Sequence, residues 1–177
     1  MHPKFIKFKI DNIKALTLFE YDVYMKDLIY KLKGCYDYEL KDIFLEPYKR
    51  ELSILYKGYT IIPAPSFHQD DINRGFNHVV EIFKSLNLPM IQAFKKIDKF
   101  KQADHNFKER KEISKYIKLI DNIELKNKIL LVDDIYTTGS TMKTMITILK
   151  NKGIKDIKVL VLCKTVLNEK VNNNLMQ

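Results

Sequence analysis

The chain has 177 residues, and 46% of them are hydrophobic, which is enough for a full core and excludes disorder as its main state. Thirty-one lysines and arginines against 22 acidic residues give a formal charge of +9, which favours polyanionic partners. With two cysteines, Cys35 and Cys163, neither a disulfide framework nor a cysteine zinc site is expected. No signal-peptide pattern and no apolar run near the roughly 18 residues of a membrane helix are present. We therefore expect a cytoplasmic protein without membrane insertion.

The first part of the chain favours helices. Apolar residues from Tyr21 to Leu32 follow a helical spacing that Gly34 would end, and a second helical stretch is predicted from Tyr38 to Pro47. Residues 1–57 are therefore expected to form a small N-terminal helical cap. Residues 58–177 would form a second domain, or one compact unit together with the cap.

The second part of the chain alternates strands with helices. Strands are predicted at 59–65, 89–97, 116–120, 128–133 and 157–163, and helices at 79–86 and 141–152. Residues 99–114 are polar and charged without a clean period, so we expect a long functional loop there. This alternation predicts an α/β fold, with a mostly parallel twisted sheet flanked by helices.

The strongest chemical signal is the stretch from Ile129 to Thr141, Ile-Leu-Leu-Val-Asp-Asp-Ile-Tyr-Thr-Thr-Gly-Ser-Thr. An apolar strand delivers Asp133 and Asp134 at its carboxyl end, where open α/β sheets bind ligands. Backbone N–H groups around Gly139, at the start of a helix, suit a phosphate, and the two carboxylates suit the vicinal hydroxyls of a polyol. An ordinary capped turn would explain one such residue but not the whole string.

Two further patterns narrow the chemistry. Neither a G-x-x-x-x-G-K-[ST] phosphate loop nor a G-x-G-x-x-G dinucleotide motif occurs, and the four histidines lack metal-ligand spacing. Arginine is scarce among the basic residues, with only Arg50, Arg74 and Arg110. Each arginine is therefore a candidate for a place that needs the planar, bidentate guanidinium.

The string resembles the phosphoribosyl diphosphate (PRPP) signature of type I phosphoribosyltransferases. Three other segments resemble one branch, the ComF family of competence-associated proteins: Tyr21 to Gly34, Ile61 to Pro65 with Arg74-Gly-Phe-Asn77, and Gln102 with Glu109-Arg110. The resemblance implies the type I phosphoribosyltransferase fold and Mg²⁺ bound through PRPP. The four-cysteine zinc ribbon of many members has no counterpart, so no metal ligated by the protein is expected.

The resemblance also implies a role for each segment. Asp133 and Asp134 would bind the ribose hydroxyls, and Arg74 with Gly75 would bind the diphosphate. The 5′-phosphate would be held by the turn that follows the strand, namely Thr137, Thr138, Gly139, Ser140 and Thr141. Residues 99–114, including Gln102, Glu109 and Arg110, would form a flexible loop that closes over the ligand. The sequence shows no acceptor pocket, so no catalytic residue is assigned.

The family's association with natural transformation implies a PRPP-binding protein of DNA uptake that binds single-stranded DNA, with the uptake machinery as a further partner. From Lys95 to Lys118, nine basic and four acidic residues alternate with aromatic ones, which suits single strands but also an ordinary solvated loop. The DNA-binding candidates are Lys95, Lys96, Lys99 and Lys101. Two other hypotheses stay open: a nucleobase salvage phosphoribosyltransferase, and a PRPP sensor without turnover.

Overall fold

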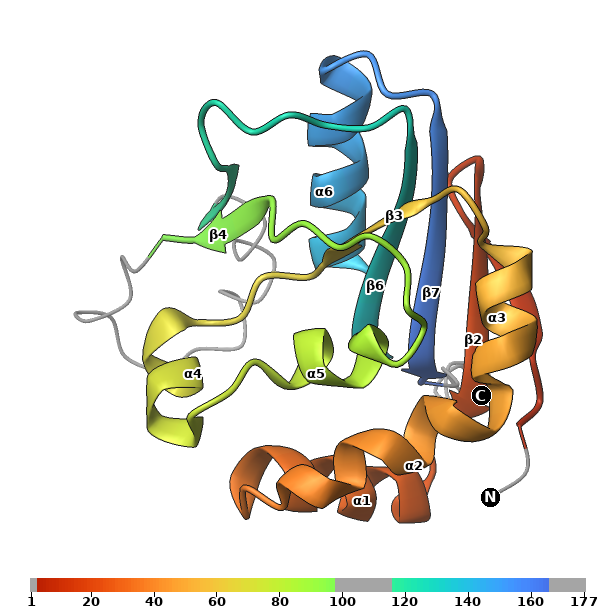
Figure 1. Ribbon diagram of the computed structural model, residues 1–177, viewed down its shortest axis with the longest axis vertical. Coiled ribbons are helices and arrows are strands. Elements are labelled where there is room, and N and C mark those ends of the chain that lie inside the picture. Colours follow the sequence, from red (N-terminus) through yellow and green to blue (C-terminus); the bar gives the residue numbers. More distant parts are fainter. Residues whose placement is uncertain (1–2, 98–115, 166–177) are drawn as a thin grey trace, which may run out of the picture.

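A five-stranded sheet forms the centre of the computed structural model, which describes residues 3–97 and 116–165 (Figure 1). The strand order is β1-β2-β7-β6-β3, and the strands are β1 (Ile6–Ile10), β2 (Ile13–Glu20), β3 (Thr60–Pro63), β6 (Lys128–Tyr136) and β7 (Asp156–Lys164). Within this five-stranded sheet, the β1–β2 pair is antiparallel and the other three pairs are parallel. The predicted mostly parallel sheet is therefore confirmed.

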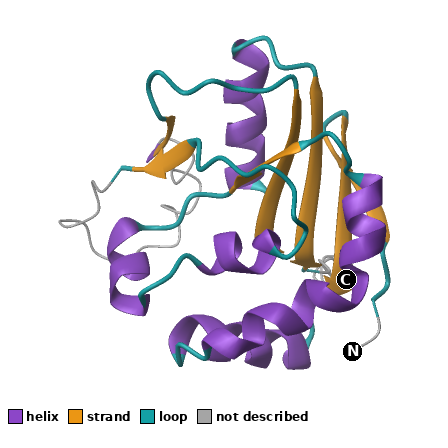
Figure 2. Cartoon of the chain, viewed as in Figure 1, coloured by secondary structure: helices purple, strands orange, loops and turns teal. Residues whose placement is uncertain are grey.

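Helices cover both faces of this sheet (Figure 2). They are α1 (Val23–Gly34), α2 (Lys41–Leu45), α3 (Lys49–Leu55), α4 (His68–Arg74), α5 (His78–Lys84) and α6 (Ser140–Asn151), with the short 3-10 turns η1 (Tyr38–Leu40) and η2 (Glu46–Tyr48). A separate antiparallel pair, β4 (Phe94–Lys96) with β5 (Ile117–Leu119), lies on the α6 side. None of the helices in the described ranges is long and apolar enough to cross a membrane.

The two faces of β6 show how the core is divided. Leu130 and Val132 pack with α1, α2, α3 and α5, whereas Ile129 and Leu131 pack with α6. Successive side chains of a strand point to opposite faces, and both faces of this strand are buried. A continuous apolar run is therefore needed in β6, as is usual for a parallel strand covered on both sides.

The N-terminal region differs from its prediction. Helices do occupy residues 23–55, but residues 6–20 form β1 and β2, and β2 pairs in parallel with β7. The expectation of a helical cap is therefore wrong for residues 6–20, which belong to the central sheet. The physical cause is visible in the sequence, because Ile6, Phe8 and Ile10 alternate with lysines in the period-2 pattern of a strand. The division at residue 57 stays a prediction.

Candidate functional site

The turn between β6 and α6 forms a small concave site. Thr137, Thr138, Gly139, Ser140 and Thr141 line a cavity of about 40 Å³ at the start of α6. Gly139 has a φ of +75°, and a Cβ at this position would lie 2.6 Å from Cζ of Tyr136, so only glycine fits. The five residues predicted to hold the 5′-phosphate are thus brought together at the N-terminus of a 12-residue helix.

A larger cavity of about 270 Å³ adjoins this turn. It is lined by cationic side chains from three elements, Lys33 of α1, Arg74 of α4 and Lys96 of β4, and by both aspartates of β6. Asp133 and Thr141 line this cavity and also the small one. The two cavities therefore meet at Asp133, at the carboxyl end of a central parallel strand.

The neighbouring aspartates face different surroundings. Asp133 lies on the α6 side of β6, whereas Asp134 is 5% exposed and points toward α1 and α5, where Lys33 forms an ion pair with its Oδ2. Burial opposes ionisation of Asp134, but the nearby Lys33 and His78 outweigh it and hold the pKa of this carboxyl well below its usual value. Burial and the charge of Asp134 raise the pKa of Asp133 instead.

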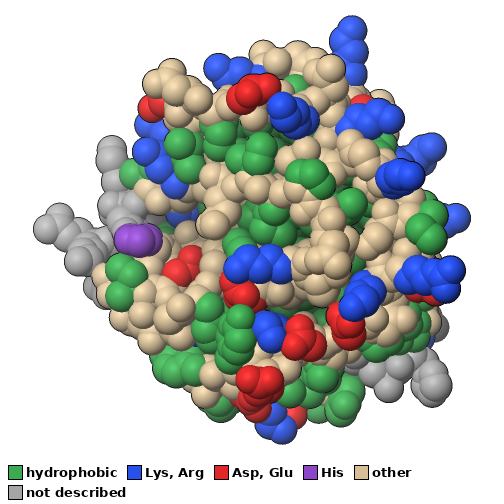
Figure 3. Space-filling model, in the orientation of Figure 1, with side chains coloured by type: hydrophobic (Ala, Val, Ile, Leu, Met, Phe, Trp, Pro, Cys, Tyr) green, Lys and Arg blue, Asp and Glu red, His purple; other side chains and the backbone are tan. Residues whose placement is uncertain are grey.

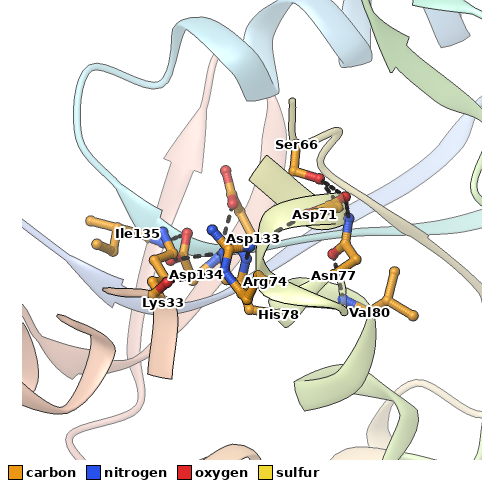
Figure 4. A network of polar contacts seen from close by, with 10 residues as sticks. All are labelled: Lys33, Ser66, Asp71, Arg74, Asn77, His78, Val80, Asp133, Asp134 and Ile135. Atoms are coloured by element: carbon orange, nitrogen blue, oxygen red, sulfur yellow. Dashed lines mark hydrogen bonds and ion pairs between the residues drawn. The ribbon is translucent and has the colours of Figure 1, made fainter. Parts of the chain in front are cut away.

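A buried polar network surrounds Asp134 (Figure 4). Nη1 of Arg74 lies 3.0 Å from Nδ1 of His78, and Nε of Arg74 donates to the backbone oxygen of Lys33 at 3.1 Å. Because a guanidinium only donates, Nδ1 of His78 accepts and the ring proton is on Nε2, which lies 3.4 Å from Oδ2 of Asp134. Burial lowers the pKa of His78, so the ring is neutral near pH 7.

The Arg-Gly-Phe-Asn motif joins two short helices. Arg74 ends α4, and Gly75 follows in the left-handed conformation, with a φ of +81° and its N–H donating to the carbonyl of Asp71 at 2.8 Å. Asn77 begins α5, where its Oδ1 accepts from the N–H of Val80 at 3.0 Å. Arg74 therefore reaches the large cavity, whereas Gly75 caps a helix and does not line it.

The candidate DNA-binding lysines separate into two groups. Lys95 is exposed on β4, but Lys96 lines the large cavity with its Nζ 4.7 Å from the ring centroid of Phe67. Burial lowers the pKa of Lys96. The other candidates and the loop residues Lys99, Lys101, Gln102, Glu109 and Arg110 lie outside the described residues. Lys96 therefore belongs to the wall of the large cavity.

Two residues of the site were missed from the sequence, Lys33 and His78. Lys33 forms an ion pair with Asp134 and His78 lies 3.4 Å from the same carboxylate, which is far away in the chain. Neither residue carries a spacing that would reveal this contact, although Lys33 lies in a segment of the family resemblance. No group of three or more His, Cys, Asp and Glu side chains within residues 3–97 and 116–165 could hold a metal ion.

The chain is similar to phosphoribosyltransferases and to competence proteins. The family model described as phosphoribosyl transferase domain matches residues 74–173, more than half of the chain. Competence protein ComFC of Streptococcus pneumoniae is 31% identical over 149 residues, 83% of this chain and 66% of that protein. Competence protein ComFC of Bacillus subtilis is 25% identical over 139 residues, which cover 77% of this chain and 58% of that protein. The chain therefore belongs to the phosphoribosyltransferase family and, within it, to the ComF family.

The chain spans about two thirds or less of the length of these two relatives. Among solved structures, a hypoxanthine phosphoribosyltransferase of Staphylococcus aureus matches with a TM-score of 0.42 at 11% identity, over 73% of this chain and 74% of that one. A hypoxanthine-guanine phosphoribosyltransferase of Bacillus anthracis matches with a TM-score of 0.32 at 12% identity, over 79% of this chain and 66% of that one. The fold assignment is instead supported by the family match and by the strand order of the mostly parallel sheet.

Proposed function

We propose that the chain binds PRPP across the two adjoining cavities. The observation that carries this proposal is that Asp133 and Thr141 line both of them. A 5′-phosphate in the turn before α6 would leave its ribose over Asp133. The diphosphate would then lie in the larger cavity, among the cations of Lys33, Arg74 and Lys96.

Each part of the site has a physical task in this proposal. Backbone N–H groups and the helix N-terminus bind the phosphate, and the Asp133 carboxylate accepts hydrogen bonds from ribose hydroxyls. The three cations offset the charge of the diphosphate, whose Mg²⁺ would enter with the ligand and neutralise part of the same charge. If the diphosphate is displaced, these cations also stabilise the leaving group.

We further propose that this binding serves natural transformation, in the cytoplasm, together with single-stranded DNA and proteins of the uptake machinery. The names of the two ComFC relatives and the charge of +9 support this role. The relatives are longer than the chain, so their partners come to it only as part of the proposal. A panel of nucleobases offered with PRPP separates this role from salvage, because only a salvage enzyme would form nucleotides.

Calorimetric titration with ribose 5-phosphate, and with PRPP and Mg²⁺, tests the binding proposal. Asp133→Asn should weaken both ligands about tenfold, or roughly 1.4 kcal/mol, because charge-assisted hydrogen bonds become neutral ones. Asp121→Asn, in an exposed turn away from both cavities, is the control and should change neither. Absence of binding by the unmodified chain, or equal effects of both variants, would refute the proposal.

The diphosphate end has its own test. Arg74→Lys keeps the charge but loses the planar fork, so PRPP should bind about tenfold more weakly while ribose 5-phosphate binds as before. The exposed Arg50→Lys in α3 is the matched control. Because Arg74 also binds Lys33 and His78, melting temperatures are measured in parallel. Equal losses for both ligands would mean that Arg74 maintains the fold and does not contact the diphosphate.

A further inference from the structure

A row of lysines crosses three neighbouring strands of the sheet. Lys9 of β1 lies directly opposite Lys14 of β2. Lys14 lies beside Lys158 of β7, because the following residues, Ala15 and Val159, pair in parallel register. Ala15 and Val159 pack on the α6 side, so the three lysines point to the other face of the sheet. The row crosses the starting end of β7, whereas the cavities lie at the carboxyl ends of the parallel strands.

Lys9, Lys14 and Lys158 form no ion pair within the described residues. Like charges directly opposite one another destabilise a pair of strands, so such a row carries a cost. Lys7 lies two residues before Lys9 and adds a fourth positive charge to the same face. The ion pairs found among the described residues are formed by other lysines. A polyanion would offset the repulsion within the row.

At one end of the row, Lys158 contacts two tyrosine rings. Lys158 is half-buried, with its Nζ 4.5 Å from the ring centroid of Tyr59 and 5.8 Å from that of Tyr56. Asp156, two residues before Lys158 in β7, accepts a hydrogen bond from the Tyr59 hydroxyl at 2.7 Å and lies opposite Lys128 in the neighbouring strand. The Tyr59 hydroxyl therefore engages Asp156, and no ion pair joins this carboxylate to Lys158 in the part of the chain that the structure describes.

The surroundings of the row are basic as well. Figure 3 shows lysine and arginine side chains gathered along the side of the molecule where β6 and β7 begin and β1 turns into β2. Neighbouring strands lie about 4.8 Å apart, so the row is about 10 Å long and one residue wide. Such a line of flexible, compact ammonium groups suits the successive phosphates of one nucleic-acid strand.

We propose that the row formed by Lys9, Lys14 and Lys158, together with Lys7, binds the phosphate backbone of single-stranded DNA. This inference rests on the DNA-binding part of the proposed function and gives it a surface separate from the two cavities. DNA and PRPP would then occupy different parts of the sheet and bind at the same time. Saturating PRPP with Mg²⁺ should not displace DNA from the chain.

The experiment is a charge reversal of the two exposed members of the row, Lys9→Glu with Lys14→Glu. Fluorescence anisotropy with a labelled oligothymidylate, between about 50 and 200 mM salt, measures affinity and its salt dependence. Affinity at low salt should fall about tenfold or more. The slope of log K against log salt should shrink by about 1.4, since each phosphate contact on a single strand contributes about 0.7.

The matched control reverses two exposed lysines on the opposite side of the sheet, Lys150→Glu with Lys152→Glu at the end of α6. It makes the same change in net charge and should have a much smaller effect. Equal losses in both double variants, or no loss in the first, would overturn the row as the binding surface. Stronger row-dependent binding to phosphatidylserine vesicles than to DNA would overturn DNA as its partner.

PRPP titration of the same variants separates failure of the row from failure of the proposed function. Unchanged PRPP binding by the Lys9 and Lys14 double variant shows that the fold and the cavities are intact. If the unmodified chain binds no DNA at low salt but does bind PRPP, the row and the DNA-binding role are both overturned, whereas the ligand site stands. If it binds DNA but not PRPP, the ligand site alone is refuted.

Discussion

Replacing Lys33 with methionine removes the positive charge beside a buried carboxylate and keeps most of the side-chain stem. The Asp134 side chain is 7% exposed and that of Lys33 is 31% exposed. Loss of one partner from a buried ion pair costs about 3–5 kcal/mol. Because Lys33 is partly solvated and His78 still faces the carboxylate, we expect about 2–3 kcal/mol here. For a chain of this length that corresponds to a fall in melting temperature of about 4–12 °C.

Urea unfolding and thermal melting measure this loss, and the same helix supplies the control. Lys31, two residues earlier in α1, pairs with Asp27 at 2.8 Å, and both side chains are 51% exposed. Lys31→Met should therefore cost much less stability than Lys33→Met, because exposed ion pairs contribute little. Adding Asp134→Asn to Lys33→Met should recover part of the stability, because a neutral amide needs no counter-charge.

Two results would contradict this reasoning. One is a loss in Lys33→Met no larger than that in Lys31→Met, which would mean that Asp134 is stabilised by other groups. The other is a double variant with Asp134→Asn whose loss equals the sum of the two single losses. Strict additivity would show that the ammonium and the carboxylate do not interact, despite their contact.

Further predictions concern His78, Gly139 and the two aspartates of the site. Burial lowers the pKa of His78, so at falling pH the unfolded chain binds a proton before the folded one, starting near the ordinary histidine pKa of about 6.5. The free energy of unfolding should therefore decline below about pH 6.5. In His78→Gln, the melting temperature should depend less on pH between pH 7 and 5. Gly139→Ala should abolish ribose 5-phosphate binding because its Cβ would overlap a tyrosine ring, whereas Gly153→Ala, with a similar φ of +83° but open space, should not affect binding. Asp134→Asn should cost about 1–3 kcal/mol of unfolding free energy and Asp133→Asn much less, as denaturant titrations can show.

Much of the fold could be predicted from local sequence patterns, and the elements that were not predicted have physical explanations. The buried strands β3, β6 and β7 were predicted because apolar runs bounded by polar residues are visible without any partner. Helix α4 was missed because His68 to Arg74 has no buried residue and so no apolar period. Its existence depends on caps and side-chain hydrogen bonds, such as that from Asn77 to Asp71 at 2.9 Å.

In the candidate site too, one part could be predicted from the sequence and another part could not. The turn from Thr137 to Thr141 was predictable because its chemistry is local: a glycine, four hydroxyls and a helix start after a strand. The surroundings of Asp134 were not, since Lys33 lies 101 positions earlier and is brought to it only when α1 packs on the sheet. Sequence patterns specify elements and turns, whereas contacts between distant elements require the assembled fold.

Side chains alternate between the two faces of a strand, and this explains why the adjacent Asp133 and Asp134 have different surroundings and different roles. Asp133 shares a face with Leu131, on the side of α6 and the small cavity, whereas Asp134 shares a face with Val132, on the side of α1 and α5. Both Asp134 oxygens have partners within the protein: Oδ1 accepts from the N–H of Ile135 at 2.8 Å, and Oδ2 faces Lys33. A bound ribose would therefore meet Asp133 with its carboxylate more available. The second aspartate connects the N-terminal helix to the central strand, so its loss should first be seen in stability and only then in ligand affinity.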